Sequence, residues 1–311
     1  MSAAPPKVSV AIWTCNQQEF IADTIASALD QDYPDLEVVV ADDHSEDDTP
    51  RIVGDWQQRF PDIVRPLFNR GERSIRKNVN RALTACTGEL VAILDGDDLY
   101  RPGKIWAQVR AFEENPDVVI CHHPVEQFDT NTGARVGMWD LNPDQPRATV
   151  ADVVAKGSFL ATASVMMRRQ AMPPGGVPPV VDNAVDYLLA IETARGGGTI
   201  LRLPEILARY RVHPAQMTNP TSRQAVVFQD VMSTLDYVER TYPDLAPRCN
   251  QGRRVFTEWE AGRRLTHSAD ARWVSAGLLT ALRYQPWRPW LWRSLVSVNA
   301  RAAARRLRPG A

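Results

Sequence analysis

The segment Leu90-Val-Ala-Ile-Leu-Asp-Gly-Asp-Asp98 joins five consecutive apolar residues to three carboxylates. An apolar run of this length, bounded by turn residues, is typical of a strand that is buried on both faces of a sheet. Two earlier segments have the same form: residues 8–13 are followed by Thr14-Cys-Asn16, and residues 36–41 are followed by Asp42-Asp43. We therefore expect three parallel strands, each ending in polar residues.

Apolar residues at helical spacing separate these strands, so the chain alternates strand and helix. We expect helices over residues 20–29, 47–59, 75–85 and 104–114, and further strands over residues 63–68 and 118–122. This alternation predicts an α/β fold, in which helices cover both faces of a mostly parallel sheet. Ligands of such sheets bind beyond the carboxyl ends of the strands.

The remainder of the chain has weaker periodicity. Residues 124–180 are rich in Pro and Gly and predict an irregular lobe with one strand near 163–167. Helices are expected over residues 186–195 and 224–242, and from residue 249 onward. The irregular lobe is therefore expected on the substrate side of the molecule.

The composition excludes several classes of protein. Of the 311 residues, 44% are hydrophobic and 23% are charged, which is unlike disordered, collagenous or disulfide-scaffold proteins. The four cysteines are far apart and lack metal-ligand spacing, so neither a zinc site nor a disulfide framework is indicated. The N-terminus lacks an apolar signal segment, and no window approaches the ~20 apolar residues of a membrane span, so we expect a cytoplasmic protein.

The formal net charge of -1 conceals an asymmetry. Residues 1–160 carry 26 acidic and 15 basic side chains, whereas residues 161–311 carry 11 acidic and 21 basic ones. From Ala271 to Ala311 there are eight Arg, no acidic residue and four of the nine Trp. The basic charge is therefore concentrated at one end of the chain.

Asp95, Asp97 and Asp98 are expected to repel one another unless a cation lies among them. Hard oxygen ligands favour Mg²⁺ or Mn²⁺, and such ions usually serve phosphate chemistry. The alternative is a solvated acidic turn, because Asp and Gly are ordinary turn residues. The local sequence leaves both interpretations open.

Asp42-Asp43 forms a second acidic strand end, which would converge with the first on one cleft. Asp43 is suited to hydrogen-bond a nucleobase or ribose, whereas Asp42 could simply begin the following turn. Arg76 and Lys77 on the intervening helix could contact phosphate, or they could form a solvated helix face. A nucleotide-plus-metal site becomes plausible when these features are combined.

In order and spacing, five segments resemble the motifs of the family 2 glycosyltransferases: Val8-Ser-Val, Thr14-Cys-Asn16, Val40-Ala-Asp-Asp-His-Ser45, Thr87-Gly-Glu89 and Leu94-Asp-Gly-Asp-Asp98. The resemblance extends from residue 7 to about residue 215. It implies a GT-A fold over residues 1–215, with a nucleotide-sugar-binding half (1–123) and an acceptor-side half (124–215). Residues 216–311 would then be a helical extension rich in Arg and Trp.

The resemblance implies an inverting hexosyltransferase. The donor would be a nucleotide-diphosphate sugar, with a UDP-sugar as the default, and Mn²⁺ or Mg²⁺ would be the cofactor. The acceptor would be a hydroxyl of a glycan or a lipid-linked saccharide in cell-surface polysaccharide synthesis. The oligomeric state is left open, and no nucleic-acid partner is expected.

The resemblance also implies roles for single residues. Asp186 matches the catalytic base, with Asp182 as a rival and a plain helix-start role as the alternative. Arg209-Tyr-Arg-Val-His213 resembles the family's closing motif, although His213 could also be a structural histidine. The expected donor-binding residues are Thr14, Asn16, Asp43, Arg76, Lys77, Asp95 and Arg211, and the expected metal ligands are Asp97, Asp95 and His213.

Two positions depart from the family pattern at the donor end. Trp13 stands where Pro is common, and Cys15 replaces a Tyr that would stack on the nucleobase. The choice among uracil, guanine and thymine therefore stays open. Acceptor contacts are expected from residues 124–180, with Ser164 and Arg168 as candidates.

The C-terminal segment permits two interpretations. Interleaved Arg and Trp over residues 278–308 could bind an anionic membrane as a peripheral anchor at the inner face of the plasma membrane. Alternatively, Trp287, Trp290 and Trp292 pack the terminal helices and the arginines face water.

Two other functions remain as alternatives. A nucleotide-sugar pyrophosphorylase would also use an Asp-rich metal site, but no Gly-rich basic loop follows the first strand. A non-catalytic carbohydrate-binding protein is the other. A dinucleotide dehydrogenase is disfavoured because the GxGxxG pattern is absent after that strand.

Overall fold

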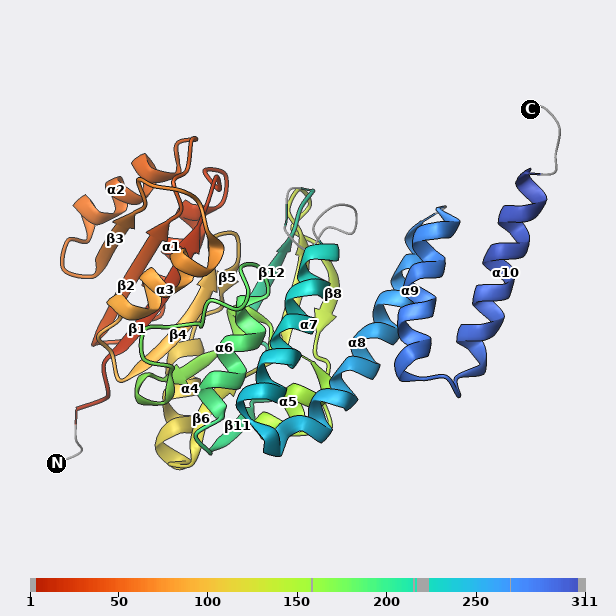
Figure 1. Ribbon diagram of the computed structural model, residues 1–311. Coiled ribbons are helices and arrows are strands. Elements are labelled where there is room, and N and C mark those ends of the chain that lie inside the picture. The colour runs from red at the N-terminus through yellow and green to blue at the C-terminus, as the bar shows by residue number, and fades with distance from the viewer. Residues whose placement is uncertain (1–3, 158, 215, 217–223, 269, 307–311) are drawn as a thin grey trace. The chain divides into compact units, whose positions relative to one another are not determined.

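The computed structural model describes residues 4–157, 159–214, 216, 224–268 and 270–306, which form two compact units (Figure 1). The first unit contains the described residues up to 153 and from 159 to 216. The second contains residues 154–157 and the described residues from 224 onward.

An eight-stranded sheet forms the centre of the first unit, in the order β3-β2-β1-β4-β10-β6-β11-β9. Its strands are β1 (Val8–Thr14), β2 (Leu36–Asp42), β3 (Val64–Phe68), β4 (Leu90–Asp95), β6 (Val118–His122), β9 (Arg147–Ala148), β10 (Met166–Arg168) and β11 (Thr199–Arg202). Strand β1 pairs in parallel with β2 and β4, whereas β10 runs antiparallel to β4 and β6. The predicted α/β fold with a mostly parallel sheet is confirmed.

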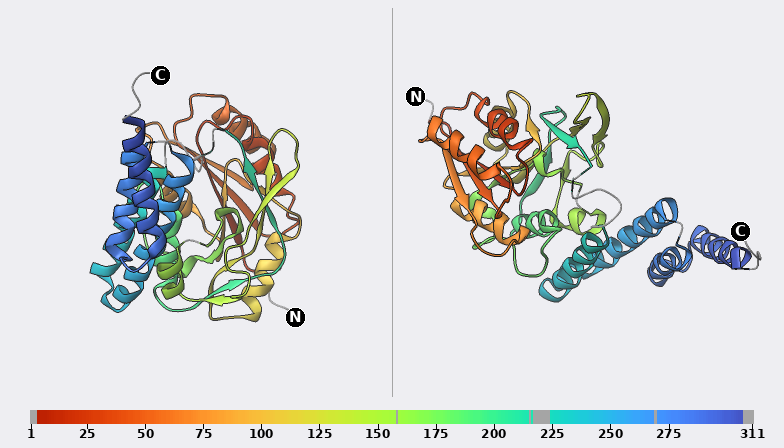
Figure 2. Two further views of the ribbon diagram at one scale, coloured as in Figure 1. Left: turned by 90° about the vertical axis from the view of Figure 1, so that its right-hand side faces the viewer. Right: turned by 90° about the horizontal axis from the view of Figure 1, so that it is seen from above.

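Helices cover both faces of this sheet (Figures 1 and 2). The helices of the first unit are α1 (Ile21–Leu29), α2 (Thr49–Arg59), α3 (Ile75–Ala85), α4 (Lys104–Glu114) and α6 (Val185–Ala194), while α5 (Val150–Lys156) reaches into the second unit. Val10 and Ile12 of β1 pack in one core with α1, α2 and α4. Because side chains alternate along a strand, Ala11 points to the other face, where α3 packs against β1, β2 and α6.

A second, four-stranded sheet has the order β5-β12-β7-β8. Its strands are β5 (Leu99–Tyr100), β7 (Val125–Asp129), β8 (Arg135–Trp139) and β12 (Ala208–Val212). The prediction of an irregular lobe over residues 124–180 was therefore wrong for its first part. Strand β8 is partly exposed along its whole length and lacks the apolar alternation that marks a half-buried strand. Short 3₁₀ helices, η1 (Thr162–Ser164) and η2 (Arg169–Ala171), flank β10 in the later part.

A buried lysine lies at the start of α4. The Lys104 Nζ donates to Gln108 Oε1 at 2.6 Å and lies 4.2 Å from the centre of the Tyr100 ring. Burial lowers the pKa of this ammonium to about 7. The folded chain therefore loses this proton several pH units before the unfolded chain does, where lysine has a pKa of about 10.4.

Lys104→Met is expected to flatten the pH dependence of stability. Between about pH 7.5 and 9.5 the unfolded state binds a proton that the folded state has lost, so this lysine makes wild-type stability rise by about 1 kcal/mol per pH unit. Urea unfolding across this range measures the difference in slope between the two proteins. Lys77→Met, which removes an exposed lysine, is the control. Equal slopes for wild type and Lys104→Met would contradict a buried, titrating Lys104.

The second unit is helical. It contains α7 (Gln224–Thr241), η3 (Pro243–Leu245), α8 (Ala246–His267), α9 (Ala271–Tyr284) and α10 (Pro289–Arg306). Val274, Leu278 and Leu291 form a small core with Trp273 and Trp290 packed against it. Within the described residues, no helix is both long enough and apolar enough to cross a membrane.

One of the three tryptophans within residues 287–292 is packed and two are exposed, so neither the packed-helix nor the membrane-anchor interpretation describes all three. Trp290 packs on the helical core, whereas the side chains of Trp287 and Trp292 are exposed. Arg308, which belongs to the predicted basic segment, lies outside the described residues.

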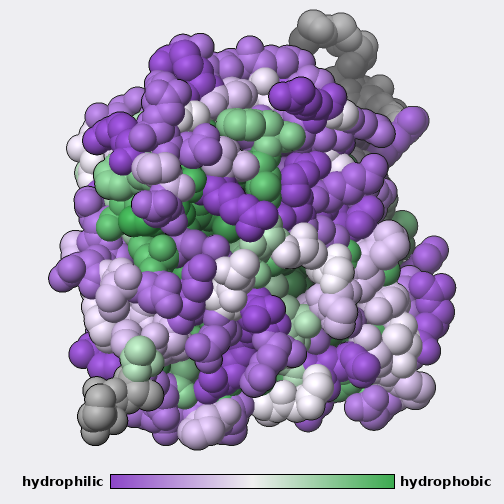
Figure 3. All heavy atoms as spheres, turned by 90° about the vertical axis from the view of Figure 1, so that its left-hand side faces the viewer, coloured by the Kyte–Doolittle hydropathy of each residue, from purple (hydrophilic) through white to green (hydrophobic). Residues whose placement is uncertain are grey.

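Hydrophilic side chains cover most of the face that is seen from the left of Figure 1, and hydrophobic ones form patches between them (Figure 3). Large exposed hydrophobic side chains are unequally distributed in the described part of the chain. Three lie in the first unit: Phe68, Val136 and Leu141. Eight lie in the second: Val226, Val255, Trp259, Leu265, Leu279, Trp287, Trp292 and Val296.

Candidate active site

The carboxyl ends of three neighbouring strands meet at one edge of the large sheet. Thr14 of β1 is paired with Asp42 of β2, and Trp13 is paired with Asp95 of β4. Gly96 permits the close approach, because a Cβ at this position would lie 2.8 Å from the Thr14 Cβ. The polar strand ends identified in the sequence are therefore neighbours in space.

Asp95 is held by the first strand. The indole Nε1 of Trp13 donates to Asp95 Oδ1 at 2.5 Å. Burial and, second, the negative charge of Asp97 raise the pKa of the Asp95 carboxyl to about 7. The charge of Asp186 also raises this pKa, whereas hydrogen bonds from Trp13 and Thr162 lower it. Asp186 thus belongs to the same electrostatic site as the acidic loop, although 91 positions separate it from Asp95 in the sequence.

Asp97 contacts the end of the second sheet. Its Oδ2 lies 2.9 Å from His213 Nε2, and its backbone carbonyl accepts a hydrogen bond from Arg211 Nε at 2.8 Å. The antiparallel pairing of β12 with β5, which joins Arg209 to Leu99, brings Arg211 and His213 to this loop. The His213 ring also packs on Phe20, with 4.7 Å between the ring centres.

Asp98 lies below this contact and is almost fully buried. Its Oδ1 accepts a hydrogen bond from the Arg211 backbone N–H at 2.9 Å, whereas Oδ2 has no hydrogen-bond partner among the described residues. Burial and the charges of Asp97 and Asp95 raise the pKa of Asp98 well above its ordinary value. An uncompensated buried carboxylate is costly unless a cation or a proton is supplied.

This donor set suits a hard divalent cation. Carboxylate oxygens and an imidazole are common ligands of Mn²⁺, and the negative charge of Asp97 raises the pKa of both Asp95 and Asp98, which a cation would offset. The described side chains do not by themselves provide a ready cluster of three ligands. Asp97 and His213 form the pair on which a cation could be held, and substrate oxygens or water would complete the shell, as is usual for Mg²⁺ with phosphates.

Arg211 is fixed on all sides. Its guanidinium lies 4.8 Å from the centre of the Phe20 ring and 5.0 Å from that of Phe128. Its NH1 lies 3.3 Å from the Thr130 hydroxyl, and its NH2 is 3.6 Å from Asp23 Oδ2. The positive charge is therefore positioned beside the acidic loop by surrounding groups.

Asp43 organises the loops that follow β2 and β3. Its two carboxylate oxygens accept hydrogen bonds from Asn69 Nδ2 and from the Ser74 backbone N–H, both at 2.8 Å. Ser74 is in turn the N-cap of α3, where its hydroxyl accepts from the Lys77 backbone N–H. Asp43 thus fixes the loop before α3, and each oxygen retains a further lone pair for a ligand.

Thr14, Cys15 and Asn16 form a tight connection beside Asp43. Asn16 has a φ of 52° and links the neighbouring loop by accepting from the Glu46 N–H at 2.8 Å. The Thr14 hydroxyl donates to Gln17, and the Cys15 thiol lies 3.4 Å from the Asp43 carbonyl oxygen. Thr14 and Asn16 therefore hold the loop, and burial raises the pKa of the Cys15 thiol.

The two candidate bases differ in their surroundings. The side chain of Asp182 is 66% exposed, and it pairs with Arg76 Nε at 3.4 Å and with the Ser74 hydroxyl at 3.3 Å. Asp186, in the first turn of α6, is partly buried, and that burial raises the pKa of its carboxyl. The structure thus pairs Arg76 with Asp182 and leaves Lys77 exposed, while the charge of Asp186 acts on Asp95.

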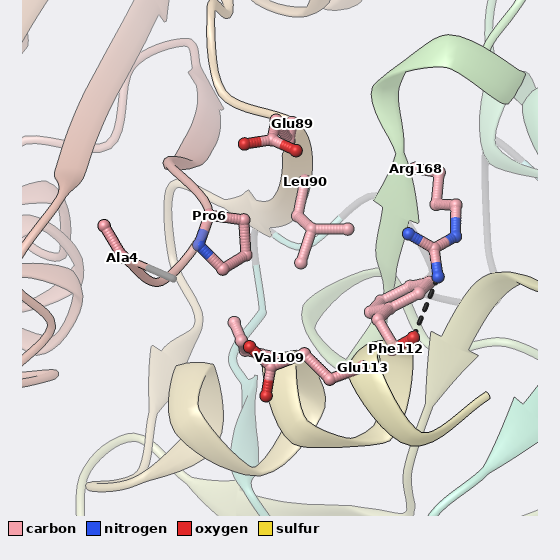
Figure 4. Close-up of a pocket in the computed structure, with 8 residues that line it drawn as sticks. All are labelled: Ala4, Pro6, Glu89, Leu90, Val109, Phe112, Glu113 and Arg168. Atoms are coloured by element: carbon pink, nitrogen blue, oxygen red, sulfur yellow. Dashed lines mark hydrogen bonds between the residues drawn. The ribbon is translucent and has the colours of Figure 1, made fainter. Parts of the chain in front are cut away.

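A shallow pocket of about 390 Å³ lies elsewhere on this unit (Figure 4). Its lining includes Leu90 and Arg168, which face each other at the beginning of β4, whereas Asp95 lies at the other end of that strand. Arg168 donates to the carbonyl oxygens of Val118 and Phe112, and the Ser164 hydroxyl donates to the Ala161 carbonyl. Both side chains are therefore engaged within the fold, and their expected contact with the acceptor stays a prediction.

A comparison of sequences identifies the family. Residues 9–172, more than half of the chain, match the sequence model described as Glycosyl transferase family 2. The chain belongs to glycosyltransferase family 2. The acidic loop at the end of β4 lies within the matched residues, and the chain is classed as a glycosyltransferase.

Three relatives illustrate the range of similarity to this family 2 chain. An uncharacterized protein of Mycobacterium tuberculosis is 32% identical over 213 residues, which are 66% of this chain and 59% of that protein. The chain therefore matches less than two thirds of that relative's length. An uncharacterized glycosyltransferase of Nostoc is 28% identical over 80% of this chain and 78% of its own. The GalNAc(5)-diNAcBac-PP-undecaprenol beta-1,3-glucosyltransferase of Campylobacter jejuni is 38% identical over 100 residues, 32% of each chain.

Solved structures show the same GT-A fold. S. aureus TarS 1-349 in complex with UDP matches with a TM-score of 0.66 and 16% identity, covering 93% of this chain and 86% of that one. The mannosyltransferase PcManGT from Pyrobaculum calidifontis, in complex with GDP-Man and Mn²⁺, matches with a TM-score of 0.56 and 21% identity, covering 95% and 86%. The predicted GT-A fold is thereby confirmed.

Several residues of the site were not predicted from the sequence. Trp13 was assigned to a departure from the family pattern, yet its indole bonds the acidic loop. Phe20, Asp23 and Thr130 surround Arg211. No local motif marks these residues, because they come from three separate parts of the chain: β1, the start of α1 and the residues after β7.

Proposed function

We propose that this chain is an inverting glycosyltransferase that moves a sugar from a nucleotide-diphosphate donor to a hydroxyl of a saccharide. The observation that carries the proposal is the meeting of the acidic ends of β2 and β4 at one sheet edge, where Asp97 contacts Arg211 and His213. A UDP-sugar is the default donor, and GDP-sugars are the second choice, because the two structural neighbours bind UDP and GDP-Man. In this scheme residues 1–123 bind the donor and residues 124–215 bind the acceptor.

Asp43 and Arg211 would bind two parts of the donor, the nucleoside and the diphosphate. The carboxylate of Asp43 accepts a hydrogen bond from the nucleobase or ribose, with Thr14 and Asn16 shaping the loop. Arg211 lies beside the diphosphate, where its fixed charge favours the negative leaving group without reorganisation. Arg76 and Lys77 contribute positive charge at the start of α3.

Asp97 and His213 would hold Mn²⁺ or Mg²⁺, with Asp95 as a neighbour that orients the loop. When bound, the cation supplies Lewis-acid stabilisation of the charge that develops on the departing diphosphate. Asp98 remains below the loop and holds the Arg211 backbone in place.

Asp186 would act as the general base. Its carboxylate accepts the proton of the acceptor hydroxyl while the oxygen attacks the anomeric carbon and the bond to the diphosphate breaks. Because the oxygen attacks from the face opposite the leaving group, the configuration at that carbon is inverted. The raised pKa of Asp186 makes the carboxylate a better proton acceptor than an exposed aspartate.

The acceptor that we propose is a glycan or a lipid-linked saccharide that serves cell-surface polysaccharide synthesis. The sugar would be transferred to it at the cytoplasmic side of the membrane. The named activity of the C. jejuni relative, which acts on an undecaprenol-linked saccharide, supports a lipid-linked acceptor.

A thermal-shift panel tests the donor class. UDP, GDP, TDP and CDP are each added with and without Mn²⁺, and one of them is expected to raise the Tm by about 5 °C or more at 100 times its Kd, a stabilisation of about 2.7 kcal/mol. The shift is expected to be larger with Mn²⁺ than without it. A panel in which no nucleotide raises the Tm would overturn the proposed function.

A further inference from the structure

The turn between α9 and α10 carries exposed aromatic and basic side chains. The side chains of Trp287 and Trp292 are 59% and 49% exposed, and those of Arg288 and Arg293 are also exposed. Arg254 of α8 joins them, because its guanidinium lies 5.0 Å from the centre of the Trp287 ring. We call these five residues the Trp-Arg tip.

The backbone beneath the tip is firmly attached to α8. Gln285 Nε2 donates to the Arg254 carbonyl at 2.9 Å, and Trp290 Nε1 donates to Glu258 Oε1 at 2.9 Å. Leu291 of α10 is fully buried in the small helical core that includes Ala261 of α8. Trp292 Nε1 donates to the Pro286 carbonyl at 2.8 Å, which fixes its indole across the turn. The exposed rings are therefore presented by an ordered turn, and hydrophobic collapse has not drawn them into the core.

The charge around the tip is positive. Residues 271–306 contain seven arginines and no acidic residue. The nearest acidic side chains, on α8, are already paired: Glu260 with Arg263 and Arg264, and Glu258 with Arg288 at 3.5 Å. Arg288 is thus partly compensated by Glu258, whereas Arg254 and Arg293 form no ion pair among the described residues, so the tip combines apolar rings with an excess of positive charge.

We propose that the Trp-Arg tip docks on an anionic lipid bilayer. Tryptophan favours the interface between headgroups and acyl chains, and arginine pairs with lipid phosphates just above it. The tip combines both kinds of side chain from α8, the turn before α10 and the start of α10, as an interfacial anchor requires. This proposal extends the proposed function, in which the acceptor is lipid-linked, by naming the surface that brings the enzyme to that lipid.

Vesicle sedimentation tests the proposal with the full chain and without donor or acceptor. The wild type is expected to sediment with phosphatidylcholine vesicles that contain phosphatidylglycerol, and to remain in solution with phosphatidylcholine alone. Neutralising a basic residue at the surface removes about 1 kcal/mol, or about fivefold in partition coefficient. The triple variant Arg254→Gln, Arg288→Gln, Arg293→Gln is therefore expected to bind about 100-fold more weakly. The double variant Trp287→Ala, Trp292→Ala is expected to lose at least about tenfold, because two aromatic rings no longer bury apolar surface at the interface.

Arg272→Gln is the matched control. Arg272 is exposed at the start of α9, and the 14 residues of that helix place it about 20 Å from the turn. It is expected to bind almost as tightly as the wild type, and circular dichroism establishes that all variants retain their helices. A loss in Arg272→Gln as large as that in the triple variant would overturn the tip as the docking site.

Two further outcomes would also overturn the proposal: no sedimentation of the wild type with anionic vesicles, or association of the chain with itself through the tip in place of lipid binding. Failure of docking is separable from failure of the proposed function, because the nucleotide panel is measured without lipid. A chain that binds nucleotide but ignores vesicles loses only the docking proposal.

Discussion

Asp186→Asn is expected to lower the rate of sugar transfer by about 10²–10⁴-fold, the usual contribution of a general base. The amide has nearly the same shape as the carboxylate but cannot accept the acceptor's proton. Donor binding should be unchanged, because the groups that would hold the donor come from β1, β2, β4 and β12. Release of nucleoside diphosphate in the presence of acceptor measures transfer, and calorimetric titration of the donor measures binding.

Asp182→Asn is the matched control for this substitution. Asp182 lies four residues earlier and is the rival carboxylate, but it is exposed and paired with Arg76. We expect its variant to retain transfer within about threefold of the wild type, because an exposed ion pair contributes about 0–1 kcal/mol. Full activity of Asp186→Asn combined with an inactive Asp182→Asn would assign the base to Asp182.

Asp97→Ala is expected to abolish the dependence of donor binding on metal. Loss of a single supporting residue around a metal commonly costs about 10–100-fold in affinity, and loss of a direct ligand should cost more. The variant also leaves His213 without its 2.9 Å partner. Titrations of the nucleotide selected by the thermal-shift panel, with and without Mn²⁺, are expected to differ in the wild type and to coincide in Asp97→Ala.

Asp23→Asn provides a control with the same change in charge. Asp23 lies at the edge of the same site, 3.6 Å from Arg211, but it is mostly exposed and is not a proposed metal ligand. Its variant should keep the response to Mn²⁺. Wild-type binding of metal and nucleotide by Asp97→Ala would show that the cation lies elsewhere.

The sequence alone predicted the first half of the fold closely. The helices at residues 75–85 and 104–114 and the strand at 118–122 have the predicted bounds. Strands that are covered on both faces are continuous apolar runs, and the helices that cover them have apolar residues at helical spacing. Both patterns lie within short segments of the chain, so they can be recognised in the sequence alone. The second sheet was missed, because its strands are short and partly exposed and are joined through residues far apart in the chain.

Part of the candidate site could likewise be predicted from the sequence, and part could not. The acidic strand ends, from Asp42 to Asp98, could be predicted as neighbours because parallel strands share one carboxyl edge. The sequence could not choose between Asp186 and Asp182, which lie within one short segment. Only the tertiary structure separates them: Asp186 is partly buried and its charge acts on Asp95, whereas Asp182 is exposed and pairs with Arg76.

The sequence also predicted where charge is concentrated, but not which charged side chains act together. Counting residues was enough to locate an acidic half and an Arg/Trp-rich end, because charge and residue type are written in the chain. Which side chains act together depends on contacts across β12 and across the turn before α10. There, pairing with β5 fixes Arg211 beside the acidic loop, and the packing of Leu291 and Trp290 on α8 leaves Trp287 and Trp292 facing outward. Such contacts join residues distant in the chain, so only the tertiary structure decides them.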